Sequence, residues 1–345
     1  MASRDPRGKP TITDVARRAG VSKSLVSLVM RGARHVSPAR RAAVMEAVAA
    51  LSYRPNAMAR GLKQQTTRIL GVLCSDLHNP FFADVVEGIR DQAARAGYRV
   101  LMNTGNRVPA QEDDAIETLL ELRVDGLILT SVLVESRLIV EASRQMPTVL
   151  VGRTARASTL DSVTNDDWAG TVAVVKHCAA LGHKRIAHVD GGLGAGAQAR
   201  RGAYEHTMRA MRLGKHVRVV AGSYTEDGGH EGALLLLDER PRPTAIFAAN
   251  DLAAIGALNA IEEKGLRVPE DVSLVGYDNT SLAALRHISL TTVHQPRIEM
   301  GQMAVAALLE RLERGRARQR RVVLAPTLVV RGTTGPPPRE RKVRP

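Results

Sequence analysis

Residues 11–62 form the segment of this 345-residue chain that most constrains what it can fold into. Thr11 and Asp14 form a T-x-x-D capping box, which predicts a helix over residues 12–19. Gly20 follows that helix directly and can adopt the left-handed backbone conformation that a tight turn requires. A capped helix that stops at a glycine turn fits the first half of a helix-turn-helix if a second helix follows it closely.

The second helix follows at once, because Ser22 is placed to cap a helix over residues 23–31. Ala16 is small enough to let this helix approach the first one, and Val26, ten residues later, is β-branched and faces the same core. With Gly20 between them, these residues have the spacing of a helix-turn-helix, whose second helix enters the DNA major groove. The sequence therefore predicts a DNA-binding module in this part of the chain.

A third helix and a hinge complete the module. Ser37 and Pro38 begin the third helix, since proline suits the first helical position. We place the DNA-binding domain at residues 9–54 and a hinge helix with its linker at residues 55–66. Gly61 within so short a helix costs about 1 kcal/mol relative to alanine. We therefore expect a hinge helix that is marginal alone and forms only against a partner.

The charge of the chain is concentrated at its two ends. The formal net charge is +14, and residues 1–65 carry thirteen Lys and Arg against three Asp and Glu. Residues 314–345 carry ten against one, whereas residues 66–313 carry 26 against 31. A basic module beside a mildly acidic middle is typical of a surface that contacts DNA phosphates. The charge thus favours double-stranded DNA as a partner.

Cysteine use and hydropathy argue against two classes of protein. Cys74 and Cys178 both lie in apolar runs, which predicts buried thiols in a reducing compartment rather than a disulfide framework. The first residues are polar and basic with no apolar stretch after them, so no secretory signal is expected. No segment has the roughly 20 apolar residues that a membrane span needs. We therefore expect a cytoplasmic protein with no membrane partner.

After the hinge, short apolar runs alternate with amphipathic stretches. Helices are expected over residues 81–96 and 251–265, between runs that are strand candidates. This alternation predicts an α/β fold of parallel sheets with helices on both faces. Nine or more strands are too many for one comfortable sheet, so two lobes are expected, with ligands bound beyond the carboxyl ends of the strands. The strand candidates are residues 68–76, 98–105, 124–131, 148–152, 185–191, 217–223, 244–250, 272–279 and 290–296.

The N-terminal module closely resembles that of the lac and galactose repressor family of bacterial transcription regulators. The matching strings are TDVARRAGVS, HVSPARR and YRPNAMARGL, and the resemblance continues from about Lys9 to Arg331. It implies a homodimer on a near-palindromic operator, with each helix 23–31 in a major groove. It also implies that paired hinge helices insert Leu62 into the central minor groove, where an apolar wedge kinks DNA. The DNA-binding candidates are Thr11, Ser22, Lys23, Ser24, Ser27, Leu28, Arg31, His35, Asn56, Ala59 and Leu62.

The rest of the chain resembles the two-lobed effector-binding and dimerisation domain of that family, which we place at residues 67–331. The strings LHNPFF, AANDLAAIG, VPEDVSLVGYDN and LTTVHQP stand at family positions. They imply a small-molecule effector, most simply a sugar or sugar derivative. Carboxylates, amides and a guanidinium bind its hydroxyls, while aromatic rings cover its C–H faces. The effector-binding candidates are Ser75, Asp76, Phe81, Phe82, Trp168, Arg200, Tyr224, Asn250, Asp278 and Gln295.

The chain departs from the family pattern at several positions. Leu25 and Leu28 stand where threonine and arginine are usual, and Leu28 offers a base only apolar contact. Arg31 stands where asparagine is usual. In the effector domain, Gly152 precedes Arg153 where many members have aspartate. The operator preference of the family therefore does not carry over at the Leu28 position, and the departures in the effector domain leave the identity of the effector open without changing the class of protein.

Two other protein classes fit parts of the sequence. Gly192, Gly194 and Ala197 follow a predicted strand in a spacing that resembles a dinucleotide fingerprint, which would favour an NAD-dependent enzyme. That fingerprint needs an acidic residue about twenty positions later, and residues 212–218 contain none. A solute-binding protein would share the two lobes, but it would need export and has no use for a DNA-binding module. We therefore expect no enzyme and no cofactor, and no clustered Cys and His spacing predicts a metal site.

Two local expectations concern the ends of elements. Residues 332–345 are basic and rich in proline, which predicts a disordered tail. They contain no leucine heptads, so the helical tetramer seam found in some relatives is not expected. Asp251 is well placed to cap the helix that follows it.

Overall fold

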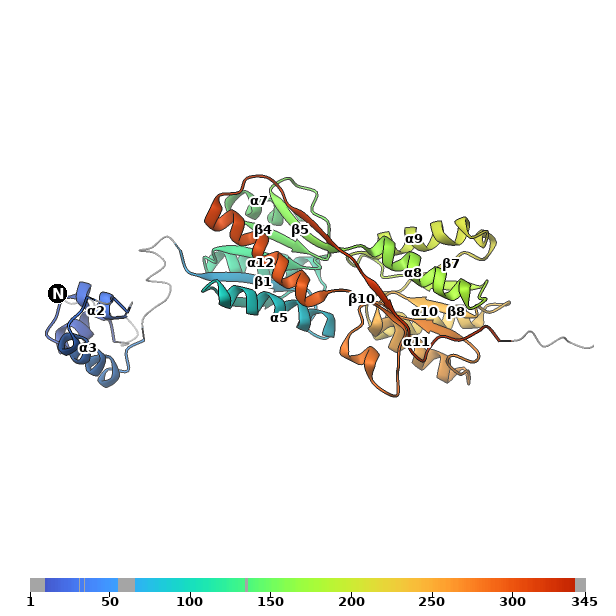
Figure 1. The fold of residues 1–345 in the computed structure, drawn as a ribbon, viewed down its shortest axis with the longest axis horizontal. Coiled ribbons are helices and arrows are strands. Elements are labelled where there is room, and N and C mark those ends of the chain that lie inside the picture. Colours follow the sequence, from blue (N-terminus) through green and yellow to red (C-terminus); the bar gives the residue numbers. More distant parts are fainter. Residues whose placement is uncertain (1–9, 31, 34, 55–65, 134–135, 339–345) are drawn as a thin grey trace, which may run out of the picture. The chain divides into compact units, whose positions relative to one another are not determined.

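The computed structural model divides the chain into two compact units, Met1–Thr67 and Arg68–Pro345. Figure 1 shows the elements of both units in sequence colours. The hinge helix expected within residues 55–66 lies outside the part of the chain that the structure describes, as do residues 339–345. The described residues are 10–30, 32–33, 35–54, 66–133 and 136–338.

The N-terminal unit is a three-helix module with a small aliphatic core. Val15, Val26 and Val44, one from each helix, are completely buried. The backbone N–H of Thr11 donates to the Asp14 carboxylate at 2.9 Å, as the capping box predicts, and Gly20 has φ +64°. The predicted helix-turn-helix and third helix are therefore confirmed. The helices are α1 (Ile12–Arg18), α2 (Lys23–Met30) and α3 (Pro38–Ala50).

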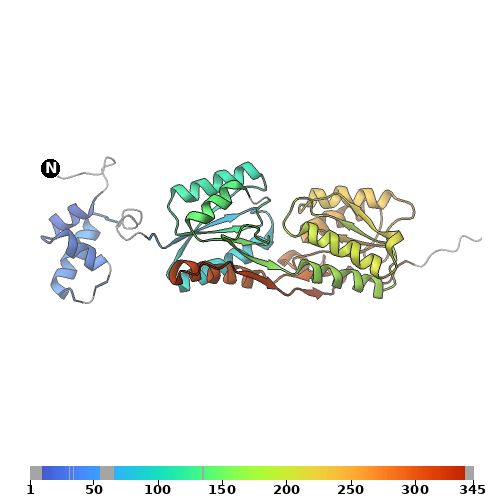
Figure 2. The ribbon, with the colours of Figure 1, turned by 90° about the horizontal axis from the view of Figure 1, so that it is seen from above.

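The first lobe of the second unit is a six-stranded parallel sheet in the order β11-β5-β4-β3-β1-β2. Helices α5 and α12 cover one face over the core around Ile89 and Leu308. Helices α6 and α7 cover the other face, over the core around Ile116 and Leu129, and Figure 2 shows both layers. The elements are β1 (Ile69–Cys74), α5 (Pro80–Arg95), β2 (Arg99–Thr104), α6 (Pro109–Glu121), β3 (Gly126–Thr130), α7 (Arg137–Gln145), β4 (Thr148–Val151), β5 (Leu160–Asn165), α12 (Arg297–Arg314) and β11 (Arg321–Leu324).

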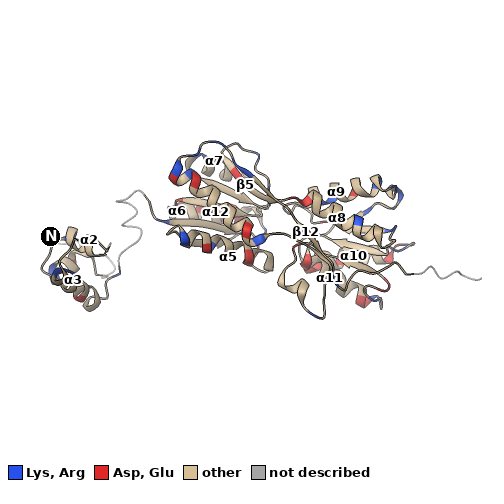
Figure 3. Cartoon of the chain, in the orientation of Figure 1, with Lys and Arg blue, Asp and Glu red and all other residues tan. Residues whose placement is uncertain are grey.

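The second lobe is a four-stranded parallel sheet in the order β7-β6-β8-β9. Two aliphatic and aromatic cores, around Leu236 and around Phe247, fill the space between this sheet and its helices. In Figure 3 the strands of both lobes are mostly tan, because charged residues lie mainly on helices and loops. The elements are α8 (Asp167–Ala180), β6 (Ile186–Val189), α9 (Ala197–Ala210), β7 (Arg218–Val220), α10 (Glu226–Asp238), β8 (Ala245–Ala248), α11 (Asp251–Glu263) and β9 (Ser273–Val275).

Within residues 136–338 the chain passes between the lobes three times (Figure 1): after β5, before α12 and after β11. The strand β10 (Thr292–His294) ends before the second passage and pairs antiparallel with β12 (Thr327–Val329), which follows the third. The two-lobed α/β fold predicted from the sequence is confirmed, and each of the nine strand candidates contains a strand. Strands β5, β11 and β12 lie outside the predicted runs.

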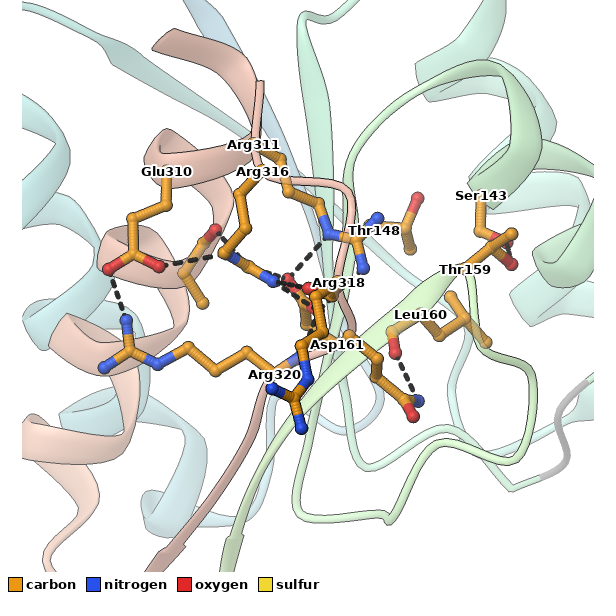
Figure 4. Close-up of polar contacts among 12 residues, drawn as sticks. Ser143, Thr148, Thr159, Leu160, Asp161, Glu310, Arg311, Arg316, Arg318 and Arg320 are labelled. Carbon is orange, nitrogen blue, oxygen red and sulfur yellow. Dashed lines mark hydrogen bonds and ion pairs between the residues drawn. The ribbon is translucent and has the colours of Figure 1, made fainter. Parts of the chain in front are cut away.

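Strand β5 was missed because its sequence, LDSVTN, is polar although all of it is buried. Asp161 is completely buried and accepts hydrogen bonds from Arg311 at 2.9 Å and from Arg316 at 2.5 Å (Figure 4). It also accepts the backbone N–H of Arg320 at 2.7 Å. Burial alone would raise the pKa of Asp161, but these hydrogen bonds and the two positive charges lower it below its usual value. This cluster ties the end of α12 to β5 and β11.

Two local expectations are wrong. The residue that caps α11 is Asn250, whose Oδ1 accepts the Ala253 N–H at 2.8 Å. Asp251 is instead buried and accepts hydrogen bonds from Thr280 and Thr292. The predicted disordered tail is ordered over residues 332–335, because Thr333 bonds to Leu274 and Thr291 and because the Gly335 carbonyl lies 2.8 Å from His183 Nε2.

The remaining composition-based expectations concern thiols, membranes and metals. Cys74 and Cys178 are free and buried, as predicted, and burial raises the pKa of Cys74 to about 11 and of Cys178 to about 12. Among the described residues, no helix is both long and apolar enough to span a membrane. Nor do those residues bring together three His, Cys, Asp or Glu side chains that could hold a metal ion.

Candidate functional site

Helix α2 presents a polar face that is available to DNA. Val26 and Val29 are buried on its inner side, whereas Ser22, Lys23 and Ser24 are exposed and Ser27 is partly exposed. Ser22 Oγ also accepts the Leu25 N–H at 3.2 Å, so it caps the helix that it begins. Short hydroxyls and one amine at the start of a helix suit contacts to base edges and phosphates.

The other predicted DNA contacts have different surroundings. Leu28 is half-buried and packs against the module core, so only part of its side chain faces outward. The hydroxyl of Thr11 donates to Asp14 at 2.7 Å, while His35 is exposed. The candidates that lie outside the described residues are Arg31, Asn56, Ala59 and Leu62.

In the second unit, a pocket opens between the two lobes at the carboxyl ends of their strands. It contains about 560 Å³ of atom-free space, a figure that includes the open solvent at its mouth. The strand-end rule for α/β sheets placed ligands here. Eight predicted effector-binding residues line this pocket: Ser75, Phe81, Phe82, Arg200, Tyr224, Asn250, Asp278 and Gln295.

The other two predicted effector-binding residues do not line the pocket. The Asp76 carboxylate accepts a hydrogen bond from the backbone N–H of His78 at 2.8 Å, and so it stabilises the turn after β1. Trp168 is 45% exposed, and its ring lies 5.4 Å from that of His206. The preceding residue, Asp167, lines the pocket in its place, because neighbouring residues in a helix point about 100° apart.

Arg200 is the best-anchored charge in the pocket. It projects from α9, is 5% exposed and donates from Nε to Asp167 Oδ1 at 2.9 Å and from Nη1 to the Ala249 carbonyl at 2.6 Å. Its guanidinium carbon lies 3.6 Å from the centre of the Tyr277 ring. A buried charge persists when an ion pair and hydrogen bonds compensate it in this way. The remaining donors of Arg200 can face a ligand.

Asp278 is a second acidic residue that lines the pocket from the second lobe. It has φ +118° and accepts Gln295 Nε2 at 2.6 Å. Burial raises the pKa of Asp278, the nearby Arg200 lowers it, and the nearby Asp251 raises it further. Arg297 crosses from α12 to donate to the carbonyls of Asp278 and Asn279 and to Asp84 on α5. Arg297 therefore links the two lobes behind the pocket.

Aromatic rings supply the apolar faces of the pocket. Phe81 and Phe82 form an edge-on pair with ring centres 5.2 Å apart. The Tyr224 hydroxyl donates to the Ala195 carbonyl at 2.8 Å. A Cβ at Gly191 or Gly194 would lie within 2.4 Å of the Tyr224 ring. Of the two glycines in the dinucleotide-like spacing, Gly194 is therefore explained by the close approach of a tyrosine, and Gly192 by its left-handed φ of +60°.

Several lining residues were not predicted. Arg107 follows β2 in a polar loop that reads as ordinary solvated surface. Asn165 is the last residue of β5, a strand that was not predicted. Asn165 donates to the Tyr277 hydroxyl at 2.8 Å, and its buried Oδ1 has no hydrogen-bond partner among the described residues. A buried acceptor without a partner is costly, so it marks a place where a ligand donor fits.

Comparisons with known proteins agree with both parts of this geometry. A family model described as bacterial regulatory proteins, lacI family, matches residues 11–56, and one described as a periplasmic binding protein-like domain matches residues 175–334. The ribose operon repressor of Haemophilus influenzae is 33% identical over 93% of this chain and 97% of its own length. The transcriptional repressor PurR of Vibrio atlanticus is 35% identical over 94% of this chain and 98% of its own length.

Solved structures give the same picture. The lac repressor dimer bound to operator and the anti-inducer ONPF superposes with a TM-score of 0.83 at 31% identity, over 95% of this chain and 99% of that one. A regulator from Enterococcus faecium with bound ribose superposes with a TM-score of 0.71 at 26% identity, over 78% of this chain and 99% of that one.

Proposed function

This chain belongs to the lacI family of bacterial regulatory proteins, and we propose that a small polar effector held between its two lobes controls how tightly it binds its operator. It is a DNA-binding transcriptional regulator and not an enzyme. We place it in the cytoplasm, where a regulator of this kind reaches the chromosome.

On the DNA side, the proposal is a homodimer on a near-palindromic site. Each α2 would enter a major groove, with Lys23, Ser24 and Ser27 facing the bases and Ser22 and Thr11 near the backbone. Leu62 would act as the minor-groove wedge, which stays a prediction because it lies outside the described residues. The exposed polar face of α2, above a core of buried valines, supports this role.

The effector is proposed to be a sugar or sugar derivative. The observation that carries this proposal is the pocket itself, which combines Arg200, Asn165, Asp278 and Gln295 with aromatic rings. Amides, carboxylates and guanidinium groups bind sugar hydroxyls, and rings cover the C–H face of a sugar. Relatives with ribose and with cellobiose bound share the fold.

Control of DNA binding follows from the position of the pocket. A ligand that contacts residues from both lobes stabilises one arrangement of the lobes over another, and it shifts the equilibrium only by its difference in affinity for the two. Three chain passages and Arg297 join the lobes. They would transmit that preference toward Arg68, where the second unit begins.

Replacing Arg200 tests the effector site. We expect Arg200→Ala to weaken binding of the effector by about 1.5–3 kcal/mol, because a hydrogen bond to a charged group is lost. Operator binding in the absence of effector should stay intact. The measurement is fluorescence anisotropy of a labelled operator during effector titration. The matched control is Arg201→Ala, since Arg201 is the next residue and pairs with Asp190 and Glu205 outside the pocket lining. An Arg200→Ala response curve identical to that of the wild type would remove Arg200 from the site.

A further inference from the structure

The loop after β2 brings an arginine to the pocket by an unusual route. Asn106 has φ +49° and Arg107 has φ +59°, so two successive residues adopt the left-handed conformation. That conformation is uncommon for an arginine and persists only where the surrounding structure holds it. Here the Arg107 N–H donates to the Ser75 carbonyl at the end of β1 at 2.9 Å. The loop therefore fixes Arg107 at the carboxyl edge of the first lobe, where it lines the pocket.

The guanidinium of Arg107 differs from those of Arg200 and Arg153 in having no hydrogen-bonded partner among the described residues of the second unit. Its carbon lies 5.7 Å from the centre of the Tyr224 ring, across the pocket in the second lobe. Over residues 66–133 and 136–338, the structure gives its side chain no ion pair and no hydrogen bond. Arg200, in contrast, is paired with Asp167, and Arg153 donates to the carbonyls of Val132 and Leu133.

The acidic groups near the pocket do not pair with Arg107. Asp167 is paired with Arg200, and the Asp278 carboxylate accepts a hydrogen bond from Gln295 in the second lobe. Glu112 is buried behind Ser75, whose hydroxyl donates to it at 2.6 Å, and it also accepts the Leu133 N–H at 3.0 Å. Burial raises the pKa of Asp278 and of Glu112. Within the described part of the second unit, Arg107 therefore lines the first-lobe side of the pocket with no acidic group paired to its guanidinium.

We propose that the effector is an anionic carbohydrate whose phosphate or carboxylate group binds Arg107. This inference rests on the proposed effector site and narrows its ligand class. A guanidinium offers five N–H donors in a fork that matches the oxygens of either anion. The hydroxyls of the same ligand would reach Asn165, Asp278 and Arg200 deeper in the pocket. An anion between Arg107 and the second lobe would also couple binding to closure of the lobes.

Matched pairs of ligands test this inference on the full chain. Calorimetric titration compares ribose with ribose 5-phosphate, and glucose with glucose 6-phosphate and gluconate, with inorganic phosphate as a further probe. We expect at least one anionic probe to bind at least tenfold more tightly than its neutral parent. Glucose 6-phosphate against gluconate then separates a phosphate group from a carboxylate group.

Variants assign the effect to one side chain. Arg107→Gln should weaken binding of the anionic probe about tenfold to a hundredfold. It should change binding of the neutral parent less than about threefold. Arg107→Lys should retain part of the preference, since it keeps the charge without the fork. Arg99→Gln is the control, because Arg99 is exposed at the start of β2, the strand that precedes the Arg107 loop. Equal weakening of neutral and anionic probes would mean that Arg107 only bridges the lobes and would overturn the inference.

Operator affinity, measured in parallel, keeps the two proposals apart. If a neutral sugar binds as tightly as its anionic derivatives and still changes operator affinity, the anionic inference fails while the proposed function stands. If an anionic probe binds through Arg107 without any change in operator affinity, the inference stands and the proposed control of DNA binding fails. Absence of binding by every anionic probe overturns the inference.

Discussion

At the scale of single residues, we expect Leu28 to set the base preference at one position of each half-site. It stands where a base-contacting arginine is usual in the lacI family. Its half-buried side chain packs on the core of the first unit. Both roles fit one residue, because the packed part of the side chain fixes its position and the outer part offers a methyl surface. Such a surface favours a thymine methyl group over the two acceptors of guanine.

We expect Leu28→Arg to shift the operator preference toward guanine at one position in each half-site, by about 1–3 kcal/mol. An arginine stem can lie along the apolar surface that Leu28 covers while its head reaches the groove. Selection from a randomised site library, for the wild type and the variant, measures the shift. Leu28→Met is the control, since it keeps an apolar contact of similar volume. Identical consensus sites for wild type and Leu28→Arg would contradict base contact, and an unfolded variant would assign Leu28 to packing alone.

Only some of the pocket-lining residues could be predicted from the sequence. Polar residues at strand ends, such as Asn250 and Gln295, were found because the carboxyl edge of a parallel sheet is a general ligand position. Trp168 was chosen over Asp167 because sequence alone does not set the rotation of a helix about its axis, which packing decides. Arg107 was missed because only two successive left-handed residues turn it toward the pocket.

At the scale of elements, the end of α12 depends on one buried carboxylate. Asp161 on β5 holds Arg311 and Arg316, and Glu310 in turn pairs with Arg316 and Arg320 (Figure 4). The same cluster explains why β5 escaped detection. A strand that buries aspartate, serine and asparagine lacks the apolar run that marks the other strands, and its partners lie about 150 residues away.

We expect Asp161→Asn to lower the free energy of unfolding of the second unit by roughly 3–5 kcal/mol at pH 7, because the partly buried Arg311 loses its carboxylate partner and Arg316 is left with Glu310 alone. The folded-state pKa of Asp161 lies below its unfolded value. Its contribution is therefore fully present above the unfolded pKa, about 3.9, and is lost as pH falls through the folded pKa.

Urea unfolding followed by circular dichroism checks this sign. The difference between wild type and Asp161→Asn should stay constant from pH 8 to about pH 5 and shrink only below about pH 4. Asp238→Asn is the control, because Asp238 pairs with Lys264 on the surface and should change stability little. A difference that shrinks already between pH 7 and pH 5 would mean that the pKa of Asp161 is raised rather than lowered.

At the scale of the whole molecule, one DNA-binding unit is joined to one effector unit. The first unit presents a single α2, and a helix of eight residues contacts only a few base pairs. Specific binding therefore needs a second copy of the helix, and two-fold symmetry in the protein requires a matching symmetry in the operator. The basic charge of residues 1–65 supplies phosphate contacts to every site, specific or not.

We therefore expect a homodimer on a near-palindromic operator, and affinity that depends on both half-sites. Sedimentation of the full chain with a full-site duplex should give two chains per duplex. A duplex with one half-site scrambled should bind much more weakly at physiological salt, because it retains specific contacts for one α2 and leaves the other with phosphate contacts alone. A fully scrambled duplex measures that phosphate-driven background. One chain per full-site duplex, with half-site and full-site affinities equal, would show that a single α2 suffices and that two-fold symmetry plays no part in recognition.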